Sequence, residues 1–145
     1  MAGYSGTPLV KKLGIKERHR IALVNAPSGF LSYLGKLPEG TLVDAGALGK
    51  QAYDIILFFT AKEGELRRDV PRLARKLRSA GALWVAWPKK ASSVPADFTE
   101  DGVRAAGLAA GLVDNKVCAV DETWSGLRLV IRLKDRGKIT APRPR

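Results

Sequence analysis

Three apolar runs in this sequence lack the alternation of apolar and polar residues that marks a half-exposed strand. They cover residues 20–25 (RIALVN), 52–59 (AYDIILFF) and 82–87 (ALWVAW). A strand that is apolar at nearly every position is buried on both faces, as strands are in a parallel sheet covered by helices. Helical patterns lie between the runs. The order of elements therefore predicts an α/β fold, a single Rossmann-like domain with helices on both faces of a mostly parallel sheet.

Capping residues and apolar periodicity predict the helices. A short helix over residues 7–14 would end at Gly14 in the left-handed conformation, and others are expected over 30–37 and 99–110. The clearest pattern is central: Leu66, Val70, Leu73 and Leu77 would share one face of a helix that ends at Gly81. Pro71 would lie in the first turn of this helix or at a kink.

The C-terminal part of the chain predicts a different kind of strand. Residues 116–120 read as a strand, 121–126 as a loop, and residues 127–133 alternate between apolar and mostly polar side chains. Alternation indicates one exposed face, so we expect a closing antiparallel strand at an edge, where its cations would discourage pairing between molecules. A short strand is also expected at 41–44. The domain would span residues 1–134, with a flexible basic tail over 135–145.

Length and composition exclude several classes of protein. A chain of 145 residues is one domain that can bury a core without disulfides. One Cys and one His cannot form a Cys/His zinc cluster, and the lone Cys118 cannot form an internal disulfide. No metal site or cofactor with a recognisable motif is expected. Neither a membrane-spanning run nor a signal-peptide core is visible, so the expected location is cytoplasmic, without a membrane partner.

The formal charge of +11 is concentrated in three segments. Residues 1–20, 61–90 and 132–145 carry 20 of the 25 basic residues and only five of the 14 acidic ones. Such segments attract polyanions, so non-specific association with nucleic acid is one interpretation. The alternative is that these cations lie on ordinary solvated faces and only keep the protein soluble.

Polar and aromatic residues follow the predicted parallel strands at their carboxyl ends, where ligands bind in sheets of this kind. The candidate ligand-binding residues are Asn25, Ser28, Gly29, Lys62, Trp87, Lys89, Lys90, Trp124 and Ser125. Ammonium groups suit phosphate or carboxylate, and indoles offer stacking faces for a flat ring. The site would therefore take a small anionic ligand. The structural alternatives are core packing for Trp87 and a solvated turn for Lys89 and Lys90.

The motifs of known cofactor and catalytic sites are missing. The loop after the first strand has one glycine and a proline where a dinucleotide site needs G-x-G-x-x-G. Asp44 lies where an acidic residue could reach a ribose, although turn chemistry explains it as well. His19 precedes the first strand, and Cys118 lies in an apolar strand, so neither reads as catalytic. We find no catalytic set, and catalytic residues are unknown.

Two resemblances emerge from these residues. A β-α-β-α series that closes with an antiparallel strand resembles an abbreviated S-adenosylmethionine-dependent methyltransferase fold. In addition, several stretches together resemble a small bacterial family, domain of unknown function 3052: AGYSGTPL at 2–9, KLGI at 12–15, NAP at 25–27, WVAWPKK at 84–90, LVD at 112–114 and KVCAVDETWSGL at 116–127. This family resemblance implies a single-domain cytoplasmic protein and assigns no residue a role.

Three functions follow as hypotheses. The leading one is a non-catalytic Rossmann-like module that binds a small anionic ligand, or a partner, at the carboxyl edge of the strands. The second is non-specific nucleic-acid association through the basic segments. The third is a divergent S-adenosylmethionine-dependent methyltransferase, against which the missing glycine loop counts.

Overall fold

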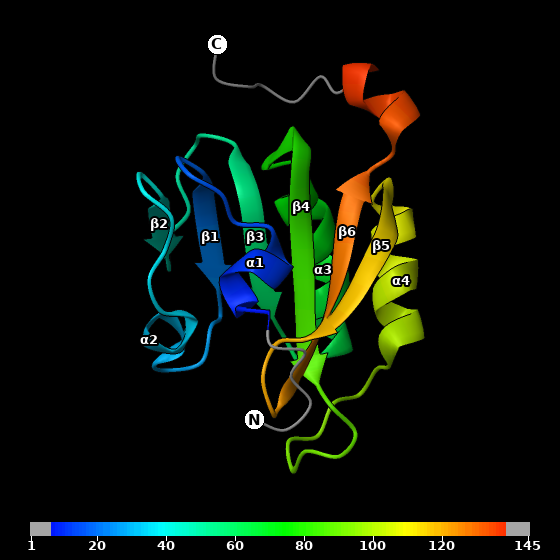
Figure 1. Ribbon diagram of the computed structural model, residues 1–145. Coiled ribbons are helices and arrows are strands. Elements are labelled where there is room, and N and C mark those ends of the chain that lie inside the picture. The colour runs from blue at the N-terminus through cyan, green and yellow to red at the C-terminus, as the bar shows by residue number, and fades with distance from the viewer. Residues whose placement is uncertain (1–6, 139–145) are drawn as a thin grey trace.

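The fold is built on one six-stranded mixed sheet, described here from a computed structural model that covers residues 7–138 (Figure 1). The strand order is β2-β1-β3-β4-β6-β5. The strands are β1 (Arg20–Val24), β2 (Leu42–Ala45), β3 (Tyr53–Phe59), β4 (Leu77–Pro88), β5 (Leu112–Ala119) and β6 (Trp124–Ile131). The first four are mutually parallel, and β6 runs antiparallel to both β4 and β5. The predicted α/β Rossmann-like class is confirmed.

Helices cover both faces of the sheet, as predicted. The helices are α1 (Leu9–Leu13), α2 (Phe30–Leu34), α3 (Glu63–Ala74) and α4 (Glu100–Ala109), and a 3-10 helix, η1, covers Leu133–Lys138. In Figure 1, α3 and α4 lie behind the sheet and α1 lies in front of it. Each face has its own core, one with Leu66, Val70 and Val103 and the other with Leu13 and Phe30. No helix within residues 7–138 is long and apolar enough to cross a membrane.

The central helix is shorter than the pattern predicts. α3 ends at Ala74, so Leu77 begins β4 and Gly81 lies inside that strand, where it ends no helix. A Cβ on Gly81 would stand 2.9 Å from the carbonyl oxygens of both Tyr53 and Asp54. The glycine therefore serves the close approach of β3 and β4 at the point where their register shifts. Pro71 lies within the helix, beyond its first turn.

The last strand was predicted at an edge, and this prediction is wrong. β6 lies between β4 and β5, so β5 is the edge strand. Leu127, Leu129 and Ile131 face the core beneath α3 and α4, while Val130 belongs to the core on the α1 face. The alternation therefore did not indicate a solvated face, because α1 covers part of it. β6 also begins at Trp124, three residues earlier than expected.

Residues 1–6 and 139–145 lie outside the described part of the chain. They include most of the first stretch that carries the family resemblance and much of the expected basic tail. Within the predicted tail, residues 135–138 belong to η1.

Candidate functional site

The described residues form an open cavity of about 740 Å³ beyond the carboxyl end of β4. Four of the nine candidate residues line it: Trp87, Lys89, Lys90 and Ser125. The register of the sheet explains why β6 contributes, since Trp87 of β4 is paired with Ser125. The rest of the lining runs from the last residue of β4 to the first turn of α4: Pro88, Ser92, Ser93, Val94, Pro95, Ala96, Phe98, Thr99, Glu100 and Asp101.

The charged groups of this cavity differ in whether they have ion-pair partners. Glu100 and Asp101 both bind the guanidinium of Arg104, at 2.6 Å and 3.1 Å, and Arg104 also binds Asp114 at 3.1 Å. Lys89 and Lys90 form no ion pair within residues 7–138. Because the two carboxylates are directed to Arg104 and not to the lysines, the ammonium groups stay available to an anion.

Trp87 lines the cavity, but its ring face is not free to stack on a ligand. The residue is only 7% exposed, and its ring packs in the core beneath α3 and α4. Its indole N–H has no hydrogen-bond partner among the described residues, although indole donors usually find one when buried. The aromatic face predicted to stack on a flat ring is therefore occupied, while one N–H donor stays available.

Backbone hydrogen bonds hold the loop that closes the cavity. The N–H of Lys89 donates to the carbonyl of Thr123 at 2.8 Å, and the hydroxyl of Ser92 donates to the carbonyl of Lys89 at 2.8 Å. Farther along, the carboxylate of Asp97 accepts from the N–H of Glu63 at 2.6 Å, at the start of α3. The loop is thus tied to β6 at one end and to α3 at the other.

Sequence reasoning missed the part of the lining that this loop supplies. The candidate set did not include Ser92, Ser93 or Thr99, and Thr99 was expected only to begin a helix. One feature could have identified them: a Ser/Pro-rich segment that directly follows a buried parallel strand lies at the ligand edge of such a sheet.

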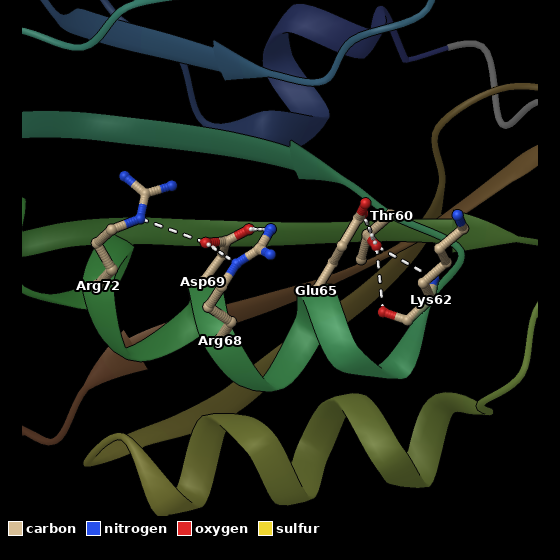
Figure 2. A network of polar contacts seen from close by, with 6 residues as sticks. All are labelled: Thr60, Lys62, Glu65, Arg68, Asp69 and Arg72. Carbon is tan, nitrogen blue, oxygen red and sulfur yellow. Dashed lines mark hydrogen bonds and ion pairs between the residues drawn. The ribbon is translucent and has the colours of Figure 1, made fainter.

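Lys62 lies at the end of β3, at the N-cap of α3, and does not line the cavity. Figure 2 shows its backbone beside Thr60, whose hydroxyl donates to Glu65 at 2.8 Å and accepts the N–H of Lys62 at 3.2 Å. This network orders the segment between β3 and α3, while the N-cap residue Lys62 makes no side-chain capping bond. The predicted ligand role of Lys62 has no support from the cavity.

The remaining candidates lie elsewhere. Asn25, Ser28 and Gly29 form the loop between β1 and α2, in which Asn25 and Gly29 have positive φ angles of 59° and 82°. Trp124 packs edge-on against Phe59, with ring centroids 5.1 Å apart, on the face of the sheet that α1 covers. The structure therefore divides the predicted set, and one cavity gathers only its β4 and β6 members.

Asp44 is committed to a structural network. Its carboxylate accepts a hydrogen bond from the hydroxyl of Tyr53 and lies 3.4 Å from the guanidinium of Arg20. Tyr53 begins β3, so this network lies toward the amino end of that strand. Burial, and then the bond to Asp44, raise the pKa of the Tyr53 phenol. These contacts explain Asp44 without a ribose ligand.

The structure also accounts for the other side chains that were considered as possible catalytic residues or metal ligands. Nδ1 of His19 accepts from the backbone N–H of Lys16 at 3.1 Å, before β1 begins. Burial raises the pKa of the Cys118 thiol, against the opposing charges of Lys116 and Lys12, which is unlike an activated nucleophile. No group of three or more His, Cys, Asp or Glu side chains within residues 7–138 could hold a metal ion.

The basic face of α3 is largely ion-paired. Asp69, only 6% exposed, holds Arg68 at 3.0 Å and Arg72 at 3.3 Å, as Figure 2 shows. The contact with Arg68 lowers the pKa of Asp69. Arg67 pairs with Glu63 one turn away. Internal pairing reduces the positive field that this helix would offer to nucleic acid.

The architecture is that of S-adenosylmethionine-dependent methyltransferases. One such enzyme from Aquifex aeolicus is 16% identical, with a TM-score of 0.60 over 86% of this chain and 88% of its own. Precorrin-6y C5,15-methyltransferase from Geobacter metallireducens is 11% identical, with a TM-score of 0.63 over 86% of each chain. Aeropyrum pernix fibrillarin with natively bound S-adenosyl-L-methionine is 16% identical, with a TM-score of 0.55 over 88% and 70% of the two chains.

At these identities the similarity shows a common fold alone. The fold is therefore similar to an abbreviated methyltransferase-type Rossmann fold. Residues 37–133 match the family described as Protein of unknown function (DUF3052), and the chain belongs to this family. Comparison with curated proteins gives no match.

Proposed function

We propose that this protein binds a small anionic ligand in the cavity beyond β4. The observation that carries the proposal is the ion pairing of the lining: Lys89 and Lys90 lack ion-pair partners within residues 7–138, while Glu100 and Asp101 are bound to Arg104. A phosphate or carboxylate would supply the ion-pair partner that the two lysines lack. The volume of about 740 Å³ is in the range of small-molecule sites.

The lining of this cavity supports a proposal of binding over one of catalysis. Hydroxyl groups are present on Ser92, Ser93, Thr99 and Ser125, but no His or Cys lines the wall beside them. A hydroxyl nucleophile needs an adjacent general base, and the two carboxylates that could serve are bound to Arg104. We therefore assign the hydroxyls of Ser93, Thr99 and Ser125, with the Trp87 N–H, as hydrogen-bond donors to the ligand, since the Ser92 hydroxyl already donates to the carbonyl of Lys89.

The experiment is a titration of the full chain with inorganic phosphate, adenosine monophosphate and citrate, followed by calorimetry and amide NMR. At least one of these anions is expected to shift the amide resonances of Ser92 and Ser125. The double variant Lys89→Gln/Lys90→Gln is expected to weaken that binding about tenfold or more, because two charged contacts are lost.

Lys36→Gln/Lys50→Gln is the matched control, since it removes the same charge from exposed positions outside the cavity. It is expected to leave affinity within about twofold, as screened surface charges do. Equal weakening by both double variants, or no binding by any of the three anions, contradicts the proposal.

A methyltransferase is the second candidate, favoured by the fold of the similar structures, among them fibrillarin with natively bound S-adenosyl-L-methionine. The residues fit this cofactor poorly. The loop after β1 contains a single glycine, Gly29, and the carboxylate of Asp44 is bound to Tyr53 and Arg20. A titration with S-adenosylmethionine and S-adenosylhomocysteine decides this candidate, and absence of binding at millimolar concentration excludes it.

A further inference from the structure

A second cavity, of about 510 Å³, opens on the α1 face of the sheet, far in the fold from the carboxyl end of β4. It lies between the C-terminal end of α1, the segment that leads to β1, and the strands β5 and β6. Five cationic side chains line it: Lys11, Lys12, Lys16, Lys116 and Arg128. Asp54 is the one carboxylate among the lining residues.

The sheet register explains why cations from distant segments meet here. Lys116 of β5 is paired with Arg128 of β6, and Arg128 is paired with Trp84 of β4. Residues paired in this way project from the same face of a sheet, and the Trp84 side chain packs in the core beneath α1. Lys116 therefore reaches α1, where its ammonium group donates to the carbonyl of Lys12 at 3.1 Å.

The single carboxylate in the lining is already used. Asp54 accepts the backbone N–H of Arg20 at 2.8 Å and forms an ion pair with Arg78 at 3.3 Å. Both partners of the Asp54 carboxylate therefore lie outside the set of five cations, and its negative charge compensates the positive charge of Arg78.

Arg128 is the least compensated of the five. It is half-buried, and within residues 7–138 its one side-chain hydrogen bond is to the amide oxygen of Asn115, at 3.3 Å. Burial, and then the charge of Arg136, lower its pKa, as expected for a half-buried cation with another cation nearby. A partly desolvated guanidinium without a carboxylate partner is stabilised when an anion joins it.

The lining also limits what the anion can be. Single-stranded nucleic acid is held on aromatic side chains that stack on its bases, and no Trp, Tyr or Phe lines this cavity. Several point charges around a concave space suit a compact ligand that carries several negative charges of its own.

We propose that this cavity is a second anion site and that it binds a compact polyphosphate group, either free or as the polyphosphate chain of a nucleotide. Arg128 supplies a planar, bidentate donor from the floor, and the lysines of α1 and β5 supply point charges around it. This site is separate from the cavity beyond β4 and does not depend on the function proposed for that cavity.

The test uses the full chain, with inorganic tripolyphosphate as the probe in calorimetry at two salt concentrations. Binding is expected, with an affinity that falls as salt increases, and the amide resonances of Gly14, Ala80 and Asn115 are expected to shift. Adenosine triphosphate is expected to bind within about threefold of tripolyphosphate, since no Trp, Tyr or Phe lines the cavity and the imidazole of His19 already accepts a hydrogen bond from Lys16. A nucleotide that binds while tripolyphosphate does not overturns the proposal.

Variants separate a built site from general attraction to a basic protein. Lys11→Gln/Lys16→Gln changes two exposed side chains and is expected to weaken tripolyphosphate binding about tenfold. Arg128→Lys keeps the charge but loses the bidentate geometry, and should also weaken binding. The control Lys36→Gln/Lys50→Gln should leave affinity within about twofold.

The proposal is overturned by no binding of tripolyphosphate, by equal weakening in the control variant, or by resonance shifts at Ser92 and Ser125 in place of those at Gly14 and Asn115. A single-stranded oligonucleotide that binds where tripolyphosphate does not also overturns it and favours nucleic acid as the partner.

Discussion

The indole nitrogen of Trp84 donates a hydrogen bond of 3.0 Å to the backbone carbonyl of Leu13, 71 residues away in the sequence. Both residues are fully buried. The carbonyl of Leu13 lies at the end of α1, where it has no helical partner, so the indole satisfies a group that would otherwise be buried without one. This bond joins α1 to the centre of the sheet.

Trp84→Phe is expected to destabilise the protein by about 2–4 kcal/mol, because it leaves the Leu13 carbonyl without a donor and opens a space in the core. Urea unfolding measures the loss. Trp124→Phe is the control, since Trp124 is only partly buried and lies at the rim of the same core, and its loss is expected to be about 1 kcal/mol. Equal losses in the two variants contradict the role given to the indole bond.

Asp69→Asn is expected to lower the free energy of unfolding at pH 7 by about 1–3 kcal/mol, because the nearly buried carboxylate loses its charged bonds to Arg68 and Arg72. The pKa of Asp69 is lowered in the folded state, so its contribution is complete above about pH 4, the range of an unfolded Asp. The contribution is lost as the pH falls through the lowered pKa.

Urea unfolding at pH 7 and at progressively lower pH checks this prediction. The difference between the wild-type protein and Asp69→Asn should shrink as the solution is acidified. Asp101→Asn, whose side chain is 94% exposed, should cost little at any pH. A difference that stays constant down to the lowest pH would show that charge is not its source.

Gly107→Ala is expected to destabilise the protein by about 1–3 kcal/mol, because the new Cβ would meet Leu129 at 2.7 Å where α4 packs on β6. Gly64→Ala is its counterpart: nothing lies within 4 Å, and the residue is helical, so a gain of up to about 1 kcal/mol is expected. Thermal unfolding of both variants should show shifts of opposite sign. A neutral Gly107→Ala would mean that Leu129 can move aside.

Asp44→Ala is expected to destabilise the protein by about 1–3 kcal/mol, since the buried hydroxyl of Tyr53 loses its acceptor. Binding of anions in the cavity beyond β4 should be unchanged, because Asp44 does not line it. Unfolding and calorimetry on the same variant separate the two effects. Binding of S-adenosylmethionine that disappears in this variant would restore Asp44 as a ribose ligand.

The sequence predicted most of the fold because burial on both faces leaves a plain pattern. The runs that form β1, β3 and β4 are apolar at nearly every position, which favours strands covered on both faces. The errors came where tertiary contacts override local pattern. Leu77 continues the helical spacing of Leu66, Val70 and Leu73, yet it lies in β4, where it pairs with Tyr53 of β3.

The position of β6 could not be read from its own residues. Alternation at 127–133 indicates two different faces but does not say whether α1 or water covers the second one. Strand order is set by contacts between distant segments, such as the pairing of Ala82 with Val130. The sequence of a single strand does not determine which strands lie beside it.

The candidate site was predicted in part for a similar reason. Carboxyl ends of parallel strands do share an edge, and this rule brought Trp87, Lys89, Lys90 and Ser125 together. It did not separate the two faces of the sheet at that edge, so Trp124, on the face opposite Trp87, was included in the same set. The second cavity was missed because the five cations belong to segments that only the fold brings together.

The interior place of β6 has a consequence for synthesis on the ribosome. The edge strand β5 joins the sheet only through β6, which emerges after it, so β4 and β5 leave the ribosome before the strand that connects them exists. The apolar edge of β4 then stays open until residue 131 has been made. Folding of the nascent chain should therefore be completed late and in one step, and chains truncated before β6 should be retained by chaperones or degraded.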